Sequence, residues 1–340
     1  MIRFSPPAHR LARWVRRFEG LDALVWGDFV LDEYWRCRSS RVSREAPVLV
    51  LEYEARTVQG GGAANAALNL AALGARVAVV GWIGRDAAGT ELKRVLEAAD
   101  IDTATLLEHD RCGTVVKTRI VAGGVHSARQ QVVRVDRGEA FPLRPGGRAR
   151  LKRALARAGE RARAVVLSDY GYDSVSPSLV RPWVRAWRGR GTVVGLDARY
   201  RLARYRDLSV ATPNEVEASA AAGIEVRSER DLARVARRLR RGLRVQNLII
   251  TRGRDGLTAW NAKHAAWIEA WGGEEAVDVT GAGDAVVAAA TLALAAGAPA
   301  LEAAALANVA GSVAVSRRGA VAVSRSDLVR ALRRTGSSPR

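Results

Sequence analysis

Helix-like and strand-like segments alternate along most of the chain, and this alternation limits the possible folds more than any other feature. The strand-like segments are short and mostly apolar, which is typical of strands buried on both faces of a sheet. Strands joined by helices run parallel, with helices covering both faces. The sequence therefore predicts an α/β fold with a mostly parallel sheet. The segments are strand 23–26, helix 62–73 with strand 76–82, helix 148–162 with strand 164–167, helix 178–188 with strand 192–196, and helix 229–241 with strand 247–250.

Three other segments alternate apolar and polar residues with a period of two. They cover 48–58, 114–121 and 131–135, and the pattern is typical of strands with one exposed face. We expect them to form a separate antiparallel sheet, a small β lid on one α/β domain. The predicted boundaries are a basic extension at 1–18, the domain at 19–334 with lid segments at about 33–58 and 112–136, and a polar tail at 335–340.

The charge balance is strongly basic. Lys and Arg number 54 against 35 Asp and Glu, which gives a formal net charge of +19. Such an excess is compatible with nucleic-acid binding. However, the cations are nearly all arginines and are scattered along the whole chain, without a single tail or stripe. Solvated, arginine-rich helix faces explain this distribution better, and some affinity for anions is expected.

The cysteines and the first residues indicate the compartment. Cys37 and Cys112 are the only cysteines, and their separation matches neither a zinc site nor a disulfide framework, which fits a reducing environment. Charged residues interrupt the N-terminal segment before the apolar core of a signal peptide develops. The uncharged stretch 285–301 is broken by Gly297 and Pro299, which predicts two packed helices instead of a membrane span. We therefore expect a cytoplasmic protein without membrane contact.

The segment DVTGAGD, from Asp278 to Asp284, stands before an alanine-rich helix and has the clearest chemical meaning. Its glycines let the backbone approach a ligand, and the free N–H groups of a first helical turn attract anions. A loop that only holds an anion has no need of the Asp284 carboxylate. A general base that meets an acceptor hydroxyl beside a phosphoryl group would need one. A simple helix cap is the alternative, and the spacing alone favours neither interpretation.

Two further segments could bind ligands. The run GGGAAN at 60–65 opens a helix, and Asn65 could bind a polyol, although a tight strand-to-helix turn has the same composition. Asn214 and Glu217 lie three residues apart, so they share a helix face. They could hold a hydrated Mg²⁺, and an ordinary helix start would look the same. The chain has no GxxxxGK[ST] segment, which excludes a P-loop kinase, and no GxGxxG after the first strand to support a dinucleotide site.

Several segments together resemble the ribokinase-like (PfkB) sugar kinases over roughly residues 20–332. They are most similar to the kinases that phosphorylate D-glycero-β-D-manno-heptose 7-phosphate at O1, which also form the first half of bifunctional ADP-heptose synthases. The resemblance implies a three-layer α/β/α fold with a β lid, which in relatives often pairs with a second subunit. The matching segments are 27–35, 40–48, 61–75, 116–119, 130–136, 166–170, 204–206, 211–214 and 278–284.

The resemblance also implies roles for single residues, with ATP and Mg²⁺ as cofactors and K⁺ as a further ion. For phosphoryl transfer these are Asp284 as the catalytic base, the backbone N–H groups of Gly281, Ala282 and Gly283 as an anion hole, and Asn214 and Glu217 as the Mg²⁺ and phosphate element. For the sugar they are Asp32, Gly61, Gly62, Asn65 and Asp169. For the nucleotide they are Thr251, Gly253, Thr280 and Asn308. Asp278 and Thr280 match a monovalent-cation site.

Two segments depart from the heptose-kinase pattern. The lysine-bearing AKG turn after LSDY is replaced by GYDS at 171–174, which puts the acid Asp173 where a base is expected. The pattern DPKG is replaced by DARY at 197–200, and arginine binds as a planar fork, unlike the point charge of lysine. The exact sugar therefore stays open, whereas the phosphoryl-transfer residues are unchanged. The cations to test for a substrate phosphate are Lys117, Arg119, Arg134 and Arg199.

The expected function is ATP-dependent phosphorylation of a sugar hydroxyl, most specifically O1 of the heptose 7-phosphate. A kinase of a hexose, nucleoside or other polyol is the alternative with the same fold. A basic nucleic-acid-binding protein or a kinase-like regulator is the non-enzymatic alternative. The expected partners are a small sugar or sugar phosphate and a second copy bound through the lid, with no nucleic acid. The four histidines are isolated and form no H-x-G-H motif, so we expect the kinase step alone.

Overall fold

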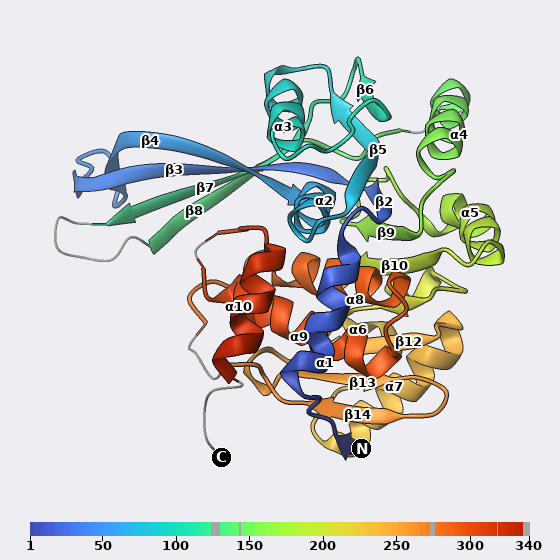
Figure 1. Cartoon of the computed structure of the whole chain (residues 1–340). Helices are drawn as coiled ribbons and strands as arrows, with labels where there is room; N and C mark the ends of the chain where they lie inside the picture. The colour runs from blue at the N-terminus through green and yellow to red at the C-terminus, as the bar shows by residue number, and fades with distance from the viewer. Residues whose placement is uncertain (124–129, 143, 273–275, 318, 336–340) are drawn as a thin grey trace.

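Helices pack on both sides of one large sheet, and a smaller sheet projects away from this body (Figure 1). The prediction of an α/β fold with a mostly parallel sheet and a β lid is confirmed. Of the predicted polar tail, residues 336–340 lie outside the described part of the chain. The computed structural model describes residues 1–123, 130–142, 144–272, 276–317 and 319–335.

The large sheet runs through the middle of the molecule. Its strands are β1 (Ile2–Arg3), β2 (Asp22–Gly27), β5 (Arg76–Gly84), β6 (Leu106–His109), β9 (Ala164–Asp169), β10 (Val193–Ala198), β11 (Val210–Ala211), β12 (Asn247–Thr251), β13 (Leu257–Trp260) and β14 (Ala265–Ile268). Within the described residues they are ordered β1-β14-β13-β12-β11-β10-β9-β2-β5-β6. Only β13 is antiparallel to its neighbours in that part of the chain.

The central strands are apolar because both of their faces are buried. In β9, Ala164 and Val166 belong to the apolar core on one side of the sheet, and Val165 and Leu167 belong to the core on the other side. Side chains of a strand alternate between faces, so continuous burial requires a continuous apolar run. This is why the short apolar segments of the sequence predict these strands.

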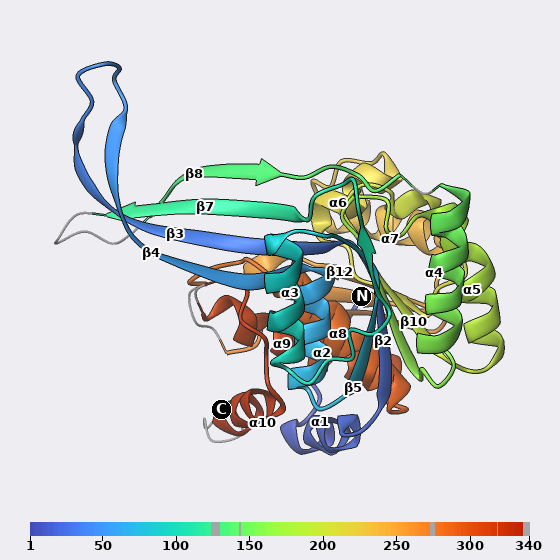
Figure 2. The ribbon, with the colours of Figure 1, turned by 90° about the horizontal axis from the view of Figure 1, so that it is seen from above.

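The helices form one layer on each face of the large sheet, and Figure 2 shows α4 and α5 on the side opposite α2 and α3. One layer contains α2 (Ala63–Ala72), α3 (Ala87–Glu97), α8 (Ala282–Ala295) and α9 (Ala300–Val315), with α1 (Ala8–Val15) and α10 (Arg325–Thr335) packed outside them. The other layer contains α4 (Pro145–Ala158), α5 (Pro177–Gly189), α6 (Glu215–Ala222) and α7 (Glu229–Leu243).

The uncharged stretch 285–301 is divided between two packed helices, as predicted. Helix α8 ends before Gly297, whose φ of +89° turns the chain, and α9 begins after Pro299. The two helices pack against each other, and their alanines lie in the core. Among the described residues, no helix combines the length and the apolar character needed to cross a bilayer.

The first eighteen residues differ from the expected extension. Strand β1 adds to the large sheet beside β14, and α1 buries Leu11, Trp14 and Val15 in the core. The Trp14 indole donates a hydrogen bond of 2.5 Å to the buried carboxylate of Glu302 on α9. The packed unit therefore begins before residue 19. Residues 1–18 are basic in overall composition, because α1 carries arginines on one side. This composition does not indicate the apolar side of α1.

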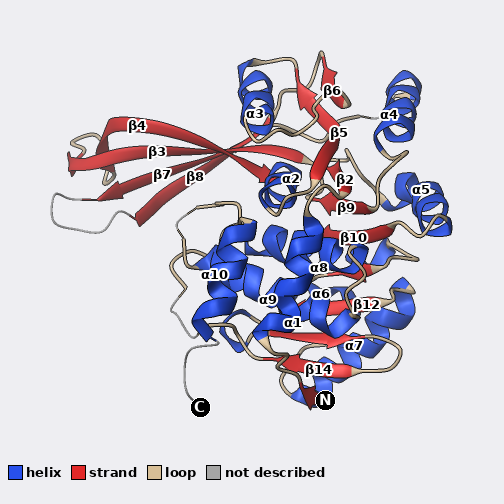
Figure 3. Ribbon diagram, in the orientation of Figure 1, coloured by secondary structure: helices blue, strands red, loops and turns tan. Residues whose placement is uncertain are grey.

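The lid is a four-stranded sheet in the described part of the chain, and its strands extend beyond the body (Figure 3). It consists of β3 (Phe29–Val42), β4 (Leu49–Gly62), β7 (Val115–Gly123) and β8 (Gln130–Arg137), in the order β4-β3-β7-β8. The predicted antiparallel pairing is found between β3 and β4 and between β7 and β8, but β3 and β7 are parallel, so the prediction is wrong for the central pair. Both strands begin at the body and run outward, since the chain returns to the body through α2, β5 and α3 between them.

The positive charge is concentrated in space although it is scattered in sequence. Helices α4 to α7 carry fourteen Arg and Lys and four Asp and Glu, whereas the six helices of the opposite layer carry eight cations and five acids. Most of the cations on α4, α5 and α7 are exposed. We call the solvent side of these three helices the basic face. The cations are not clustered in the sequence, so the sequence did not predict the basic face.

Candidate active site

A cleft of about 1430 Å³ brings together residues from the lid, from the ends of the central strands and from the start of α8. Parallel α/β sheets commonly bind ligands at the carboxyl ends of their strands. Most of the predicted site residues line this cleft. They are Asp32, Gly62, Asn65, Lys117, Arg134, Arg199, Asn214, Glu217, Thr251, Gly253, Thr280, Gly281, Ala282, Gly283, Asp284 and Asn308.

The start of α8 has no side-chain cap. Gly281 is the N-cap residue with a φ of +79°, and its lack of a side chain is required, because a Cβ there would lie 2.5 Å from Nδ2 of Asn65. The N–H of Ala282 donates to the carbonyl of Val279 at 3.3 Å, so it is already used within the turn. The open end of the helix dipole, with the N–H of Gly283, is left for an anion in the cleft.

Asp284 does not cap its helix, which separates the two interpretations that its position in the sequence left open. Its Oδ2 accepts a hydrogen bond of 2.7 Å from Nδ2 of Asn65, and its Oδ1 accepts one of 3.3 Å from the hydroxyl of Tyr170. The carboxylate is 4% exposed and lines the cleft. Its two donors come from α2 and from the turn after β9, so three distant segments fix its position.

The surroundings of Asp284 give it the acidity of a general base near neutral pH. Burial raises its pKa, the hydrogen bonds from Asn65 and Tyr170 lower it, the charge of Asp32 raises it, and the charge of Lys117 lowers it, with a result of about 7. A base is most effective when its pKa is close to the working pH. Asp284 can therefore accept a proton and release it again at neutral pH.

Asp32 and Gly61 meet at the base of the lid. A Cβ on Gly61 would lie 2.4 Å from Oδ2 of Asp32, so the glycine makes room for this carboxylate. Oδ1 of Asp32 accepts a hydrogen bond of 2.6 Å from Nη1 of Arg119 on β7. Both side chains of this ion pair are largely buried. Gly61 thus acts through the position of Asp32, and it does not itself line the cleft.

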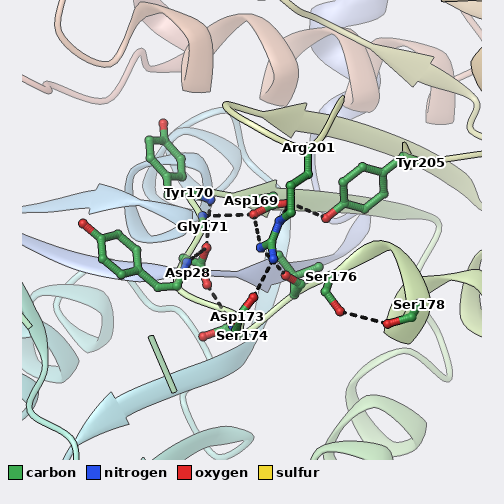
Figure 4. A network of polar contacts seen from close by, with 12 residues as sticks. Asp28, Asp169, Tyr170, Gly171, Asp173, Ser174, Ser176, Ser178, Arg201 and Tyr205 are labelled. Atoms are coloured by element: carbon green, nitrogen blue, oxygen red, sulfur yellow. Dashed lines mark hydrogen bonds and ion pairs between the residues drawn. The ribbon is translucent and has the colours of Figure 1, made fainter. Parts of the chain in front are cut away.

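The turn after β9 is held by buried carboxylates (Figure 4). Asp28 accepts hydrogen bonds from the backbone N–H groups of Tyr170 at 2.8 Å, Tyr172 at 3.0 Å and Ser174 at 2.9 Å. Burial raises the pKa of Asp28 to about 6, although these backbone hydrogen bonds oppose the shift. Asp28 therefore fixes the backbone of the turn, and the side chain of Tyr170 extends from the turn toward Asp284.

Asp169 and Asp173 are directed away from the cleft. Asp169 is paired with Arg201 and accepts a hydrogen bond of 2.6 Å from the hydroxyl of Tyr205. Asp173 is also paired with Arg201. Neither carboxylate lines the cleft, so the geometry does not place Asp169 against a sugar. The acid at 173, which departs from the lysine-bearing pattern, is neutralised by Arg201.

The four candidate cations differ in whether they already have a partner. Arg119 is bound to Asp32, and Arg134 is bound to Asp136 by two contacts of 2.8 and 3.0 Å. Within the described residues, Lys117 and Arg199 form no salt bridge. Both line the cleft, and Nζ of Lys117 lies 5.4 Å from the ring centre of Tyr170. These two cations are available for an anionic ligand.

Asn214 and Glu217 cap α6 and also line the cleft. Oδ1 of Asn214 accepts from the N–H of Glu217 at 2.8 Å, and Oε2 of Glu217 accepts from the N–H of Asn214 at 3.0 Å. Burial raises the pKa of Glu217. Asp197, which also lines the cleft, has a pKa well above its usual range because of burial and of the charges of Asp284 and Glu217. Crowded carboxylates of this kind suit a hydrated divalent cation.

The remaining predicted residues follow β12, belong to α9 or precede α8, and of them Asp278 does not line the cleft. Thr251 and Gly253 follow β12, and Asn308 of α9 donates a hydrogen bond of 2.6 Å to the carbonyl of Glu269. The oxygens of Asp278 accept from the N–H groups of Thr280 and Gly319, both at 2.9 Å. Among the described residues, no group of three or more His, Cys, Asp or Glu side chains has the arrangement of a metal site.

The sequence did not single out several residues of the cleft. Tyr170 and Asp197 each follow or end a central strand, and both belong to segments that the resemblance covers or departs from. Their position at the carboxyl ends of adjacent strands could have indicated that they belong to the ligand site. Gln131 also lines the cleft and lies in the matching segment 130–136, although no role was predicted for it. Nothing in the local sequence indicated Trp271, Arg317 and Arg330, which line the cleft as well.

A sequence profile of pfkB family carbohydrate kinases matches residues 24–327. The chain belongs to this family. It is therefore a carbohydrate kinase, a phosphotransferase that acts on a sugar hydroxyl. Asp284 lines the cleft of about 1430 Å³ in this pfkB kinase.

Relatives of this pfkB kinase include the bifunctional protein HldE of Geobacter metallireducens. The two are 37% identical over 310 residues, which are 91% of this chain and 62% of that protein. The chain thus spans less than two thirds of the length of that relative.

Two solved structures share the fold of this pfkB kinase. The ribokinase of Arabidopsis thaliana, complexed with ribose and ATP, has a TM-score of 0.71 at 17% identity, over 92% of this chain and 99% of that one. Phosphofructokinase-2 of Escherichia coli, in complex with potassium, has a TM-score of 0.73 at 18% identity, over 93% and 99%. At these identities the likeness concerns the fold alone.

Proposed function

We propose that this carbohydrate kinase transfers the γ-phosphoryl group of ATP to O1 of D-glycero-β-D-manno-heptose 7-phosphate. The observation that carries this proposal is that Lys117 and Arg199, which form no salt bridge within the described residues, line the same cleft as Asp284. An acceptor that already bears a phosphate needs such partners. The matching segments and the HldE relative support a heptose phosphate in particular.

The proton of the acceptor hydroxyl goes to Asp284. As the acceptor oxygen bonds to the γ-phosphorus, the bond from that phosphorus to the β–γ bridging oxygen breaks and ADP leaves. Most of the catalysis in such a transfer is positioning and electrostatic stabilisation. The open end of α8 at Gly281 and Gly283 lies beside the base, so it would stabilise the negative charge on the transferred group. The lid would exclude water that could otherwise attack ATP.

Mg²⁺ fits the residues of the cleft. Asp197 and Glu217 are crowded carboxylates with raised pKa values, and a divalent cation would relieve their repulsion. Asn214 and Glu217 use one oxygen each to cap α6, so contact through water suits them better than direct coordination. Mg²⁺ bound there would neutralise charge on the phosphate oxygens. K⁺ beside Asp278 and Thr280 is part of the same proposal, and the E. coli relative in complex with potassium supports it.

A second copy of the chain would complete the lid. Several large apolar side chains of the lid are exposed, including Trp35 at 38%, Tyr53 at 61% and Val133 at 44%. Exposed apolar surface of this kind typically marks an interface. We therefore propose a homodimer that forms through the lid, and its mass in solution by light scattering tests this directly.

We also propose a cytoplasmic location. Cys37 and Cys112 are both free and buried, as expected for a protein in a reducing compartment. The proposed donor, ATP, supports the same compartment. Fractionation of cells that produce the chain tests the proposal.

The experiment that tests the function measures ADP release with Mg-ATP. The acceptors are D-glycero-D-manno-heptose 7-phosphate, sedoheptulose 7-phosphate, fructose 6-phosphate, fructose and ribose. Selective turnover of the heptose phosphate is expected. Turnover of an unphosphorylated sugar alone would overturn the proposal and favour a pfkB kinase of another sugar. No turnover of any acceptor would favour an acceptor outside this set or a regulatory protein.

Variants of the two free cations sharpen this test. Lys117→Met and Arg199→Met should each raise KM for the phosphorylated acceptor at least tenfold, since each removes a charge-assisted contact. Arg134→Met is the matched control, because Asp136 already neutralises Arg134. An equal effect of all three variants would contradict the assignment of the phosphate to Lys117 and Arg199.

A further inference from the structure

A chain of hydrogen bonds leads to Asp284 through two buried asparagines of α2. The backbone N–H of Val323 donates to Oδ1 of Asn69 at 3.0 Å. Nδ2 of Asn69 donates to the Asn65 carbonyl at 2.9 Å and to Oδ1 of Asn65 at 3.2 Å. Nδ2 of Asn65 then donates to Oδ2 of Asp284 at 2.7 Å. Both asparagines are 1% exposed, so water does not compete for these bonds.

The direction of this chain is fixed at the end remote from Asp284. A backbone N–H is always a donor, so Val323 requires the oxygen of the Asn69 amide to face it. The NH₂ of Asn69 then faces Asn65. If the Asn65 amide were reversed, its NH₂ would meet the NH₂ of Asn69, and its oxygen would meet the carboxylate of Asp284. Both contacts would be repulsive, so only the observed orientation satisfies all the groups.

Packing restricts the Asn65 side chain further. Gly281 approaches it so closely that a Cβ would lie 2.5 Å from Nδ2. Nδ2 is also 3.5 Å from the Gly281 carbonyl. The amide is therefore enclosed between the start of α8 and Asn69 of α2, and it has little space to adopt another rotamer.

We propose that Asn69 is a positioning residue, which holds the NH₂ group of Asn65 against Asp284 and so fixes this carboxylate for the acceptor hydroxyl. Asn69 does not line the cleft, so it acts only through Asn65. The inference rests on the proposed role of Asp284 as the base. Asn65, which the resemblance places at the sugar, then has a second role, because its NH₂ group donates directly to Asp284.

The relay has a consequence that a merely structural contact would lack. A donor beside a carboxylate stabilises its charged form, and the hydrogen bond from Asn65 lowers the pKa of Asp284 against the effect of burial, the largest contribution. A half-turn of the Asn65 amide exchanges its oxygen and NH₂ without needing new space. Without Asn69, the contact on the α2 side that opposes this half-turn is lost, so the donor to Asp284 is held less firmly. The other groups around Asp284 are Tyr170 from the turn after β9, Asp197 of β10, Asp32 of β3 and Lys117 of β7.

The test replaces Asn69 with leucine, which has a similar size and no hydrogen-bonding group. The matched control is Thr105→Val, which removes a buried hydroxyl that donates 2.8 Å to the carbonyl of Val79 and lies outside the cleft. The pH dependence of kcat/KM is measured for both variants with the acceptor that turns over. The carboxyl ¹³C signal that Asp284→Asn removes is titrated in parallel, and this readout needs no turnover.

Asn69→Leu should move the acid limb of kcat/KM and the titration of Asp284 upward by about one pH unit, the size of one hydrogen bond to a charged group. Thr105→Val should lower the melting temperature and leave both unchanged. An Asn69→Leu protein with reduced kcat/KM at every pH and an unshifted titration would overturn the inference. Full activity of Asp284→Asn would instead overturn the proposed base, so the two failures are distinguishable.

Discussion

The hydroxyl of Tyr170 lies 3.3 Å from Oδ1 of Asp284, while Asn65 binds the other carboxylate oxygen. The two residues are 114 positions apart in the sequence. Tyr170 is held by a turn whose backbone is bound to Asp28, and Asp284 is held in the first turn of α8. The Asp284 carboxylate is thus held between Asn65 and Tyr170, and its pKa depends on both.

Tyr170→Phe should weaken the kinase most at low pH. The change removes a donor to Asp284, so the charged carboxylate is less stable and its pKa rises. The acid limb of kcat/KM should move upward, and activity at pH 7 should fall several-fold, whereas activity at pH 9 should be nearly retained. Tyr172→Phe is the control, because Tyr172 contributes its backbone N–H to the turn and the described structure shows no hydrogen bond from its hydroxyl. Equal profiles of the two variants would contradict this role of Tyr170.

The wild-type enzyme should lose activity below about pH 7. A general base works only in its ionised form, and the pKa of Asp284 is about 7, raised chiefly by burial. At pH values well below the pKa, kcat/KM should fall about tenfold for each pH unit. Asp284→Asn should lower kcat by at least about a hundredfold at every pH and leave nucleotide binding, measured by calorimetry, nearly intact. Substantial turnover by that variant would exclude Asp284 as the base.

Gly281→Ala and Gly283→Ala should differ sharply although they lie two residues apart. At Gly281 a Cβ would lie 2.5 Å from Asn65, and φ is +79°, which non-glycine residues rarely adopt. At Gly283 a Cβ meets no atom within 4 Å. Gly281→Ala should displace Asn65 and reduce kcat strongly, whereas Gly283→Ala keeps its backbone N–H and should retain most activity. Initial rates at saturating ATP measure both, and the reverse order would refute the close approach at Gly281.

Asp28→Asn should destabilise the fold by about 1–3 kcal/mol, the cost of leaving a buried donor without an acceptor. The wild-type carboxylate accepts from three backbone N–H groups, and an amide NH₂ cannot replace the lost oxygen. Urea denaturation measures the change. Asp22→Asn, at the start of β2, is the control, because Asp22 forms an exposed pair with Arg76 and such pairs contribute little.

The same carboxylate predicts a pH dependence of stability. Burial raises the pKa of Asp28 to about 6 from its ordinary value of 3.8, so the folded state binds a proton that the unfolded state has lost. The contribution of Asp28 to the free energy of unfolding should therefore decrease as the pH rises from about 4 to 6. Asp28→Asn should lack this contribution, and an identical pH slope in both proteins would contradict it.

The basic face should determine retention on an anionic matrix. Reversing three of its exposed arginines, Arg153→Glu, Arg185→Glu and Arg238→Glu, should lower the salt concentration at which the protein leaves a heparin column. The reason is that clustered cations release counterions together, whereas isolated cations contribute less.

The control for the basic face has the same net charge. Arg16→Glu, Arg94→Glu and Arg111→Glu reverse three exposed arginines that lie elsewhere. Elution of both variants at the same salt concentration would show that overall charge alone determines retention.

Much of the fold could be predicted because burial leaves a local pattern. The apolar runs of the central strands follow from burial on both faces, as Ala164 to Leu167 show. Gly74 ends α2 with a φ of +100°, as its position after the helical segment predicts. The candidate base was also local information, because Asp284 stands in a glycine-bearing segment directly before a helix. The sequence alone could not distinguish the role of Asp284 as a base from a role as a helix cap. The three-dimensional contacts of its carboxylate were needed for that.

Other features could not be predicted because they depend on which distant segments meet. The sequence places the acid Asp173 in the segment expected at the acceptor site. In the structure Asp173 is paired with Arg201 and does not line the cleft. Arg119 and Lys117 look alike in sequence, but only Arg119 has Asp32 as a partner. The parallel pairing of β3 with β7 depends on the route of the chain between them.

The sequence by itself determined the α/β class, the glycine-bearing entry into α8 and several residues that line the cleft, Asp284 among them, because periodicity and helix termini are local properties. Only the tertiary structure decided which of the candidate cations form no salt bridge within the described residues, that Asn65 and Tyr170 bind the same carboxylate, and that scattered arginines gather on one face. Each of these depends on distances between residues far apart in the chain, and such distances are set when the helices and strands pack.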